Sequence, residues 1–143
     1  MCIRDSARPL PDDLLGKVEI LVPNESELRI AAGLDEEATV EKAARSLVER
    51  GCGAVVVTLG GQGGLIVTSE GSAGVPAFKV KAVDSVGAGD AFVAALAYAV
   101  CSGRDLEGAA AFACAAAALA TTRSGAQPSL PTLGEVERFL GVS

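Results

Sequence analysis

The stretch Asp84-Ser85-Val86-Gly87-Ala88-Gly89-Asp90-Ala91-Phe92 decides how this chain is organised. Glycines at 87 and 89 permit backbone angles closed to other residues and let a ligand approach the chain closely. If the apolar run after Asp90 is a helix, the amide groups at its start point outward and attract anions. Asp90 is then suited to act as a base that takes a proton from an attacking hydroxyl. A glycine turn capped by an aspartate is the structural alternative, and local sequence gives it equal weight.

Length and composition limit the classes of protein to consider. The 143 residues suffice for one domain or part of one. Half of them are hydrophobic, only 3% are aromatic and 17 are glycine, which favours closely packed helices on a sheet. The net charge of −6 argues against nucleic acid or an anionic membrane surface as a partner. An acidic protein can still bind nucleotide phosphates through backbone amides and metal ions.

Cysteine usage and apolar runs indicate the compartment. The four cysteines lack C-x-x-C spacing and the chain has no histidine, so a zinc site is not expected. Buried thiols in a reducing cytoplasm are the better interpretation. The first residues lack the apolar core of a signal peptide, and the runs 91–100 and 109–120 are too short to span a bilayer. We therefore predict a cytoplasmic protein with no membrane partner.

Hydrophobic patterns predict alternating strands and helices. Apolar and β-branched runs predict strands at 18–22, 54–58 and 65–68, and an alternating pattern predicts another at 78–83, after a turn at 70–74. Helices are predicted at 25–32, from the acidic residues at 35–37 to Gly51, at 90–101, at 106–122, and through Leu140 after the capping-box spacing of Thr132 and Glu135. This order predicts an α/β fold with a mostly parallel sheet covered on both faces.

Three further motifs have both a functional and a structural interpretation. The loop 58–63 follows a predicted strand, where α/β sheets bind ligands, but a glycine-rich hairpin turn is the alternative. Asn24-x-x-Glu27 has the pattern of a helix cap with an exposed first-turn glutamate. The segment 122–129 could equally be a surface loop, and Cys114 a buried helix thiol. Neither a G-x-G-x-x-G dinucleotide fingerprint nor a P-loop is present.

Four segments together resemble the PfkB family of ribokinase-type sugar kinases. They occur in the family's order: Asn24-Glu25-Ser26-Glu27, Thr58-Leu59-Gly60-Gly61-Gln62-Gly63, Asp84-Ser85-Val86-Gly87-Ala88-Gly89-Asp90 and Thr122-Arg123-Ser124-Gly125-Ala126-Gln127-Pro128-Ser129. The resemblance implies a ribokinase-like three-layer α/β/α fold, truncated, with residues 8–143 as its C-terminal part. Residues 1–7 lie outside the resemblance and are expected to be a leader, either artefactual or naturally disordered. The sugar-binding half and the β lid have no counterpart, so we expect a fragment that is inactive when isolated.

The resemblance also implies a reaction, the ATP-dependent phosphorylation of D-ribose to ribose 5-phosphate, in an enzyme that can form a homodimer. Asp90 would be the base, and the backbone amides of Gly87, Ala88 and Gly89 would form the anion hole. The residues implied to contact ATP are Asn24, Thr58, Gly60, Gly61, Gln62, Gly63, Gly89 and Cys114. At position 114 family members commonly have asparagine or histidine, so cysteine weakens any specific hydrogen bond to adenine.

Two cations follow from the same resemblance. Glu27 would help to hold Mg²⁺, which usually keeps several waters and needs few protein carboxylates. A monovalent cation, usually K⁺, would be held by Asp84, Val86, Ala120, Arg123, Gly125 and Ser129. Two alternatives remain open: another sugar or nucleoside kinase of the family, such as a fructokinase or deoxyribokinase, or a non-catalytic nucleotide-binding fragment.

Overall fold

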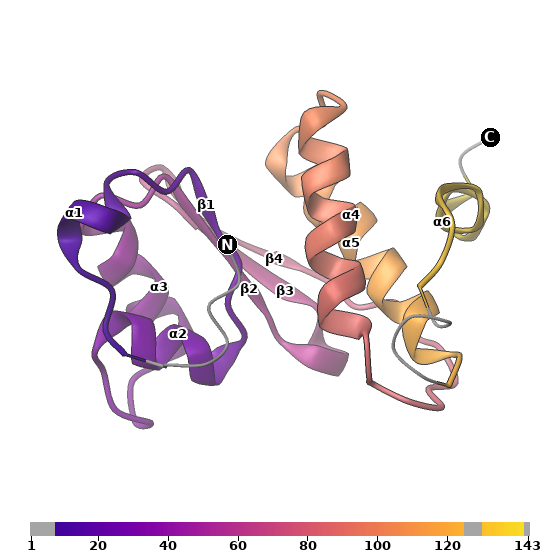
Figure 1. The fold of residues 1–143 in the computed structure, drawn as a ribbon, viewed down its shortest axis with the longest axis horizontal. Coiled ribbons are helices and arrows are strands. Elements are labelled where there is room, and N and C mark those ends of the chain that lie inside the picture. Colours follow the sequence, from indigo (N-terminus) through magenta and orange to yellow (C-terminus); the bar gives the residue numbers. More distant parts are fainter. Residues whose placement is uncertain (1–7, 125–129, 142–143) are drawn as a thin grey trace. The chain divides into compact units, whose positions relative to one another are not determined.

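The structure, a computed structural model, describes residues 8–124 and 130–141. The chain divides into two compact units, one with the residues up to Leu59 and Leu65–Gly74, the other with Gly60–Gly64 and the residues from Val75 onward. Figure 1 labels the helices and strands along the chain. In order they are α1 (Asp12–Leu15), β1 (Ile20–Leu21), α2 (Glu25–Ala32), α3 (Val40–Glu49), β2 (Ala54–Thr58), a 3₁₀ turn (Gly60–Gln62), β3 (Gly64–Thr68), β4 (Gly71–Val75), α4 (Ala88–Cys101), α5 (Leu106–Thr121) and α6 (Leu133–Leu140).

The first unit is built around β2. This strand pairs in parallel with β1, with Ile20 opposite Ala54 and Leu21 opposite Val55. Its residues from Ala54 to Val57 are all buried, as predicted for a strand covered on both faces. Helices α2 and α3 pack against β2 and against each other. Their contribution to the core includes Leu28 and Leu47, both fully buried.

The helix ends of this unit follow local capping rules. Helix α2 occupies the predicted residues and ends at Gly33, whose φ of 70° lies in the left-handed region. Helix α3 begins at Val40, later than the acidic residues 35–37 suggested, because the Thr39 side chain accepts a hydrogen bond from the Lys42 amide and caps it. The short helix α1 was not predicted.

The sheet differs from the sequence prediction at its end. The strand order is β1-β2-β3-β4, and the connections after β2 and β3 are too short for a parallel crossover, so these strands form hairpins. The predicted turn at 70–74 is wrong, because Gly71–Val75 forms the edge strand β4, a place that tolerates glycine. The predicted strand at 78–83 is also wrong: those residues pair with no strand of the described sheet, and alternation alone provides no partner.

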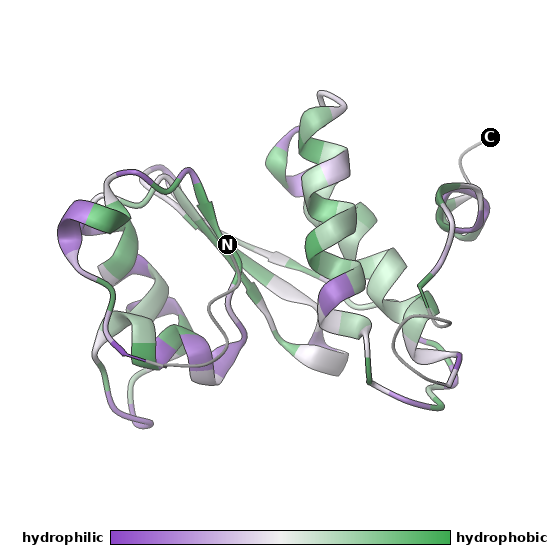
Figure 2. Cartoon of the chain, in the orientation of Figure 1, coloured by the Kyte–Doolittle hydropathy of each residue, from purple (hydrophilic) through white to green (hydrophobic). Residues whose placement is uncertain are grey.

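Two apolar helices dominate the second unit. Helices α4 and α5 pack side by side (Figure 1), and Figure 2 shows that both are hydrophobic along most of their length. Alanines such as Ala109, Ala113 and Ala116 are buried in α5, and their small side chains allow the backbones to approach. At the turn between the helices the Arg104 guanidinium lies 4.6 Å from the centre of the Phe112 ring. Helix α5 also contacts α6.

Within the described residues, no helix combines the length and apolar character needed to cross a membrane.

Candidate functional site

A helix begins within residues 84–92, at the place where the sequence predicts an anion-binding helix end. Gly87 precedes the helix with φ 87°, in the left-handed region that favours glycine, and as the N-cap residue it provides no side-chain hydrogen bond. The first helical residues are Ala88, Gly89 and Asp90, so the helix begins two residues earlier than predicted. By position, their amides have no acceptor within the helix. The Ala88 amide donates to the Ser85 carbonyl at 3.2 Å, so an anion would compete with this bond.

Gly89 is open to an approaching ligand. Its φ does not lie in the left-handed region, and a Cβ added to it would meet no atom of the described residues within 4 Å outside the helix's own backbone. Neither backbone conformation nor packing therefore requires glycine here. The small residue leaves space beside the first amides of the helix, which suits close contact with a phosphate.

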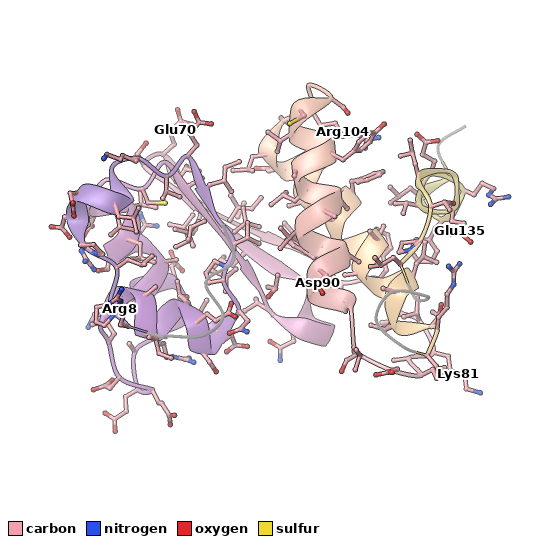
Figure 3. All side chains as sticks on the ribbon, in the orientation of Figure 1. Arg8, Glu70, Lys81, Asp90, Arg104 and Glu135 are labelled. Atoms are coloured by element: carbon pink, nitrogen blue, oxygen red, sulfur yellow. The ribbon has the colours of Figure 1, made fainter. Side chains whose placement is uncertain are left out.

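Asp90 lies in the first turn of α4 and is exposed (Figure 3). A carboxylate in this turn interacts favourably with the helix dipole, which is the structural interpretation of the residue. Its exposed position in the first turn of the helix also suits the predicted role of Asp90 as a base. The base role stays a prediction.

Backbone hydrogen bonds join residues 84–90, called the signature from here on, to the end of α5. The amides of Val83 and Asp84 both donate to the Thr121 carbonyl, at 2.7 and 3.0 Å. The Asp84 Oδ1 atom in turn accepts the Val86 amide at 3.0 Å, which closes a turn before Gly87. The structure thus brings the segment of Asp84 and Val86 beside the helix end that carries Ala120 and Arg123. Gly125 and Ser129, the other two predicted cation ligands, lie outside the described residues.

Oxygen atoms at the end of α5 are partly engaged. The Ala120 carbonyl accepts the Arg123 amide at 3.4 Å, and the Thr122 amide donates to the Leu119 carbonyl at 3.1 Å. A carbonyl oxygen has two lone pairs, so the long bond to Ala120 does not prevent that oxygen from coordinating a cation. Carboxylate and carbonyl oxygens are suitable ligands for a hard monovalent cation, and the four described residues remain predicted ligands.

The Arg123 side chain has a partner that the sequence did not reveal. Its Nη2 atom lies 2.6 Å from the Glu135 Oε1 atom, and its Nη1 atom 3.4 Å from Oε2. Glu135 also completes the predicted capping box of α6, because its Oε2 atom accepts the Thr132 amide at 2.7 Å. The capping spacing identified Glu135 as a helix cap, but no local pattern indicates a contact between residues 123 and 135.

This pairing predicts an unusually acidic carboxyl group. The hydrogen bond from Arg123, followed by that from the Thr132 amide, lowers the pKa of Glu135 from 4.5 to about 2. Because the folded pKa lies below the unfolded value, Glu135 adds stability above pH about 4.5 and loses it as the pH falls toward 2. A ¹³C NMR titration should find the Glu135 carboxylate still ionised at pH about 3. In the Arg123→Gln variant it should titrate at higher pH, and a midpoint near 4.5 in the unmodified chain would contradict the pairing.

The glycine loop after β2 contains two kinds of glycine. Gly60, Gly61 and Gln62 form an exposed 3₁₀ turn, and Gly60 has φ 56°. Gly63 is buried with φ 92°, and an added Cβ would collide with the Val75 carbonyl and lie 2.7 Å from the Ala77 amide nitrogen. Gly63 is therefore required by the fold. Gly61 is not, because a Cβ there would meet no atom within 4 Å.

Asn24, Glu27 and Thr58 meet at the carboxyl ends of β1 and β2. Asn24 forms a parallel bridge with Thr58, whose amide donates to the Pro23 carbonyl at 2.9 Å. This is the sheet edge at which open α/β folds bind ligands. Asn24 and Glu27 form a capping box, in which Asn24 Oδ1 accepts the Glu27 amide at 2.8 Å and Glu27 Oε2 accepts the Asn24 amide at 3.0 Å. The cap explains both residues structurally, and their contacts with nucleotide and Mg²⁺ stay predictions.

Cys114 has the properties of a packed thiol. It is 6% exposed within α5. Burial raises the pKa of its thiol to about 11, so the group is neutral at ordinary pH. These properties favour the structural interpretation of Cys114, and the adenine contact stays a prediction.

Among the described residues, no group of three or more histidine, cysteine, aspartate or glutamate side chains could hold a metal ion. A shallow groove in the first unit contains none of the predicted site residues and is lined by Leu34, Lys42, Arg45, Ser46 and Glu49. A Mg²⁺ ion bound at the predicted site near Glu27 would therefore depend on substrate phosphates and water for most of its ligands.

Comparisons with known proteins point to one family. A sequence model described as pfkB family carbohydrate kinase matches residues 1–133. The deoxyribokinase of Salmonella typhi is 39% identical over 129 residues, which cover 89% of this chain and 42% of that protein. Ribokinase from Thermotoga maritima has 41% identity and a TM-score of 0.86, covering 92% of this chain and 45% of that one. Arabidopsis thaliana ribokinase, solved with ribose and ATP, has 32% identity and a TM-score of 0.88, covering 99% and 46%.

Two further matching structures hold cations. A putative ribokinase II from E. coli, in complex with ATP and Mg²⁺, is 31% identical, with a TM-score of 0.81 and coverage of 91% of this chain and 41% of that one. Phosphofructokinase-2 from Escherichia coli, in complex with potassium, is 31% identical, with a TM-score of 0.79 and coverage of 91% and 43%. The chain thus spans less than half the length of each of these relatives.

Proposed function

Because the chain belongs to the pfkB family of carbohydrate kinases, we propose that it supplies the phosphate-binding part of an ATP-dependent sugar kinase. The observation that carries this proposal is the start of α4. There a left-handed Gly87, a Gly89 with space beside it and an exposed Asp90 occur together at a helix start. This combination provides both a site for phosphate charge and a base for the acceptor hydroxyl.

The proposed chemistry is an in-line phosphoryl transfer. The Asp90 carboxylate accepts the proton of the sugar hydroxyl as its oxygen attacks the γ-phosphorus of ATP. The bond from the γ-phosphorus to the bridging oxygen breaks, and ADP leaves with the bonding electron pair. Charge that develops on the equatorial oxygens is stabilised by the amides of Gly87, Ala88 and Gly89. Asp90 then returns its proton to solvent.

The residues present fit the cations that the resemblance implies. Glu27 uses Oε2 for its helix cap, and its other oxygen, Oε1, is the atom we assign to the water shell of Mg²⁺. Asp84 and the carbonyls of Val86, Ala120 and Arg123 would hold K⁺ beside the signature, together with Gly125 and Ser129. When bound, the two ions would neutralise phosphate charge and order the anion-binding amides.

The nucleotide contacts form a second part of the proposal. We assign the ATP contact to residues at the carboxyl ends of β1 and β2, in the glycine loop and at the start of α4, with Cys114 near the base. They are Asn24, Thr58, Gly60, Gly61, Gln62, Gly63, Gly89 and Cys114. The exposed turn at residues 60–62 supports this assignment, because its backbone is accessible to a ligand.

For the sugar we propose D-ribose, phosphorylated to ribose 5-phosphate in the cytoplasm. The Gly125-Ala126-Gln127-Pro128-Ser129 sequence and the ribokinases among the relatives support this substrate. The deoxyribokinase similarity favours deoxyribose as a second candidate, since the 39% identity to that enzyme exceeds the 35% and 37% to these two bacterial ribokinases.

A binding experiment on the 143-residue chain tests the proposal directly. The ¹⁵N-labelled chain is titrated with the non-hydrolysable analogue AMP-PNP in the presence of Mg²⁺. Amide shifts are expected at Gly61, Ala88 and Gly89, with smaller changes elsewhere. AMP without its β- and γ-phosphates should leave Ala88 and Gly89 unchanged. Equal responses to both nucleotides, or none to either, would contradict a phosphate site at the start of α4.

A further inference from the structure

The Arg123–Glu135 pair lies next to the proposed cation ligands. Arg123 follows α5, and its carbonyl is a proposed ligand of the monovalent cation. Its positively charged side chain therefore begins next to the proposed cation site. Its guanidinium is held by both Glu135 oxygens, with the shorter distance 2.6 Å. The two side chains are 36% and 29% exposed, which leaves the pair only partly screened by solvent.

Hydrogen bonds to Thr132 hold Glu135 in place. Its Oε2 atom accepts the Thr132 amide at 2.7 Å, and its backbone amide donates to the Thr132 hydroxyl. Such a reciprocal cap restricts the rotamer of Glu135 before it meets Arg123. The rigid guanidinium fork then transmits that restriction, because two parallel contacts set orientation as well as distance.

From Arg123 the connection continues to the signature. The Arg123 amide donates to the Ala120 carbonyl, and the neighbouring Thr121 carbonyl accepts the amides of Val83 and Asp84. The Asp84 side chain then closes the turn that leads to Gly87. The last turn of α5 is therefore the common contact of α6 and the signature.

We propose that Glu135 is a positioning residue that keeps the Arg123 guanidinium away from the carbonyls at the end of α5, so that a monovalent cation can occupy them. The carboxyl end of a helix carries negative partial charge and attracts any nearby cation, including an arginine side chain. Without Glu135, Arg123 would turn back to these carbonyls and compete with K⁺ for them. This inference rests on the cation site of the proposed function.

Thallium binding to the 143-residue chain tests the competition. The affinity for Tl⁺, a probe for K⁺, is measured by ²⁰⁵Tl NMR in Glu135→Gln, in Glu137→Gln and in the double variant Arg123→Gln/Glu135→Gln. Glutamine at 135 can still accept the Thr132 amide, so the cap is retained. Glu135→Gln should weaken binding about tenfold, the size expected for one charge-assisted hydrogen bond, and Glu137→Gln should not.

The double variant decides between competition and a general loss of structure. Removing Arg123 as well should restore most of the Tl⁺ affinity, because the competing guanidinium is gone. A double variant as weak as Glu135→Gln, or a Glu135→Gln variant that binds as tightly as Glu137→Gln, would overturn the inference.

Hydrogen exchange provides a readout that does not need the cation. The amides of Val83 and Asp84 should exchange faster in Glu135→Gln than in Glu137→Gln, because a displaced Arg123 disturbs their shared acceptor at Thr121. Equal exchange rates in both variants would overturn the positioning role. If the unmodified chain binds no Tl⁺, the cation part of the proposed function fails, and the exchange rates still decide whether Glu135 controls this helix end.

Discussion

Replacing Asp90 with asparagine should lower kcat by a factor of about 10²–10⁴, the usual contribution of a general base. Asparagine has nearly the same shape but cannot accept the hydroxyl proton. The affinity for ATP should change little, because the amides of Ala88 and Gly89 are retained. The measurement requires a complete kinase, for which this chain can replace the matching C-terminal part of Thermotoga maritima ribokinase, with which it shares 41% identity.

The matched control for this experiment is Asp35→Asn. Asp35 accepts the Glu37 amide at 3.1 Å in a local turn, which asparagine can also do, and it belongs to no proposed site. Its kcat should equal that of the unmodified chimera. The isolated chain should show no turnover of ribose. Near-normal kcat in Asp90→Asn would remove the base from the mechanism, whereas a chimera inactive before any substitution would indicate failed assembly.

Two glycines of the same loop should respond in opposite ways. Gly63→Ala should destabilise the fold by about 3 kcal/mol or more, because a left-handed φ and a collision with the Val75 carbonyl both oppose a side chain. Gly61→Ala should change the free energy of unfolding by less than about 0.5 kcal/mol, since a Cβ there meets no atom within 4 Å. Urea unfolding of the two variants measures the difference.

Nucleotide binding tests the role of Gly61 separately from the stability of the fold. If the backbone at 61 approaches ATP, Gly61→Ala should weaken binding of AMP-PNP although its fold is intact. A Gly61→Ala variant that binds as well as the unmodified chain would remove Gly61 from the nucleotide site. Gly63→Ala with unchanged stability would contradict the close contact between the loop and residues 75–77.

Local patterns predicted much of the fold. The ribokinase-like fold, truncated relative to complete enzymes, is confirmed by the structural similarities. Helix α2 and helix α6 occupy their predicted residues, because a cap marks the start of each, Asn24 or Thr132, and a glycine marks the end, Gly33 or Gly141. Predictions failed where pairing mattered. The strand β4 and the unpaired segment 78–83 could not be distinguished from alternation alone.

Among the candidate site residues too, local features could be predicted from the sequence and contacts between distant residues could not. The order of glycines and Asp90 predicted a helix start with outward-pointing amides, and the structure has Gly87 in the left-handed conformation just before that helix. Sequence alone could not separate Gly63 from Gly61, since what distinguishes them is the distance to Val75 and Ala77. It also did not indicate that the Thr121 carbonyl would accept the amides of Val83 and Asp84.

The family and the outline of helices and strands could be inferred from the residues alone, and the residues that act on phosphate could be predicted, because these depend on caps, hydrophobic period and motif spacing. The folded chain was needed to show which glycine the packing requires, which strand ends meet at Asn24 and Thr58, and that Glu135 holds Arg123. Such contacts join residues far apart in the chain. They depend on three-dimensional distances that no local pattern encodes.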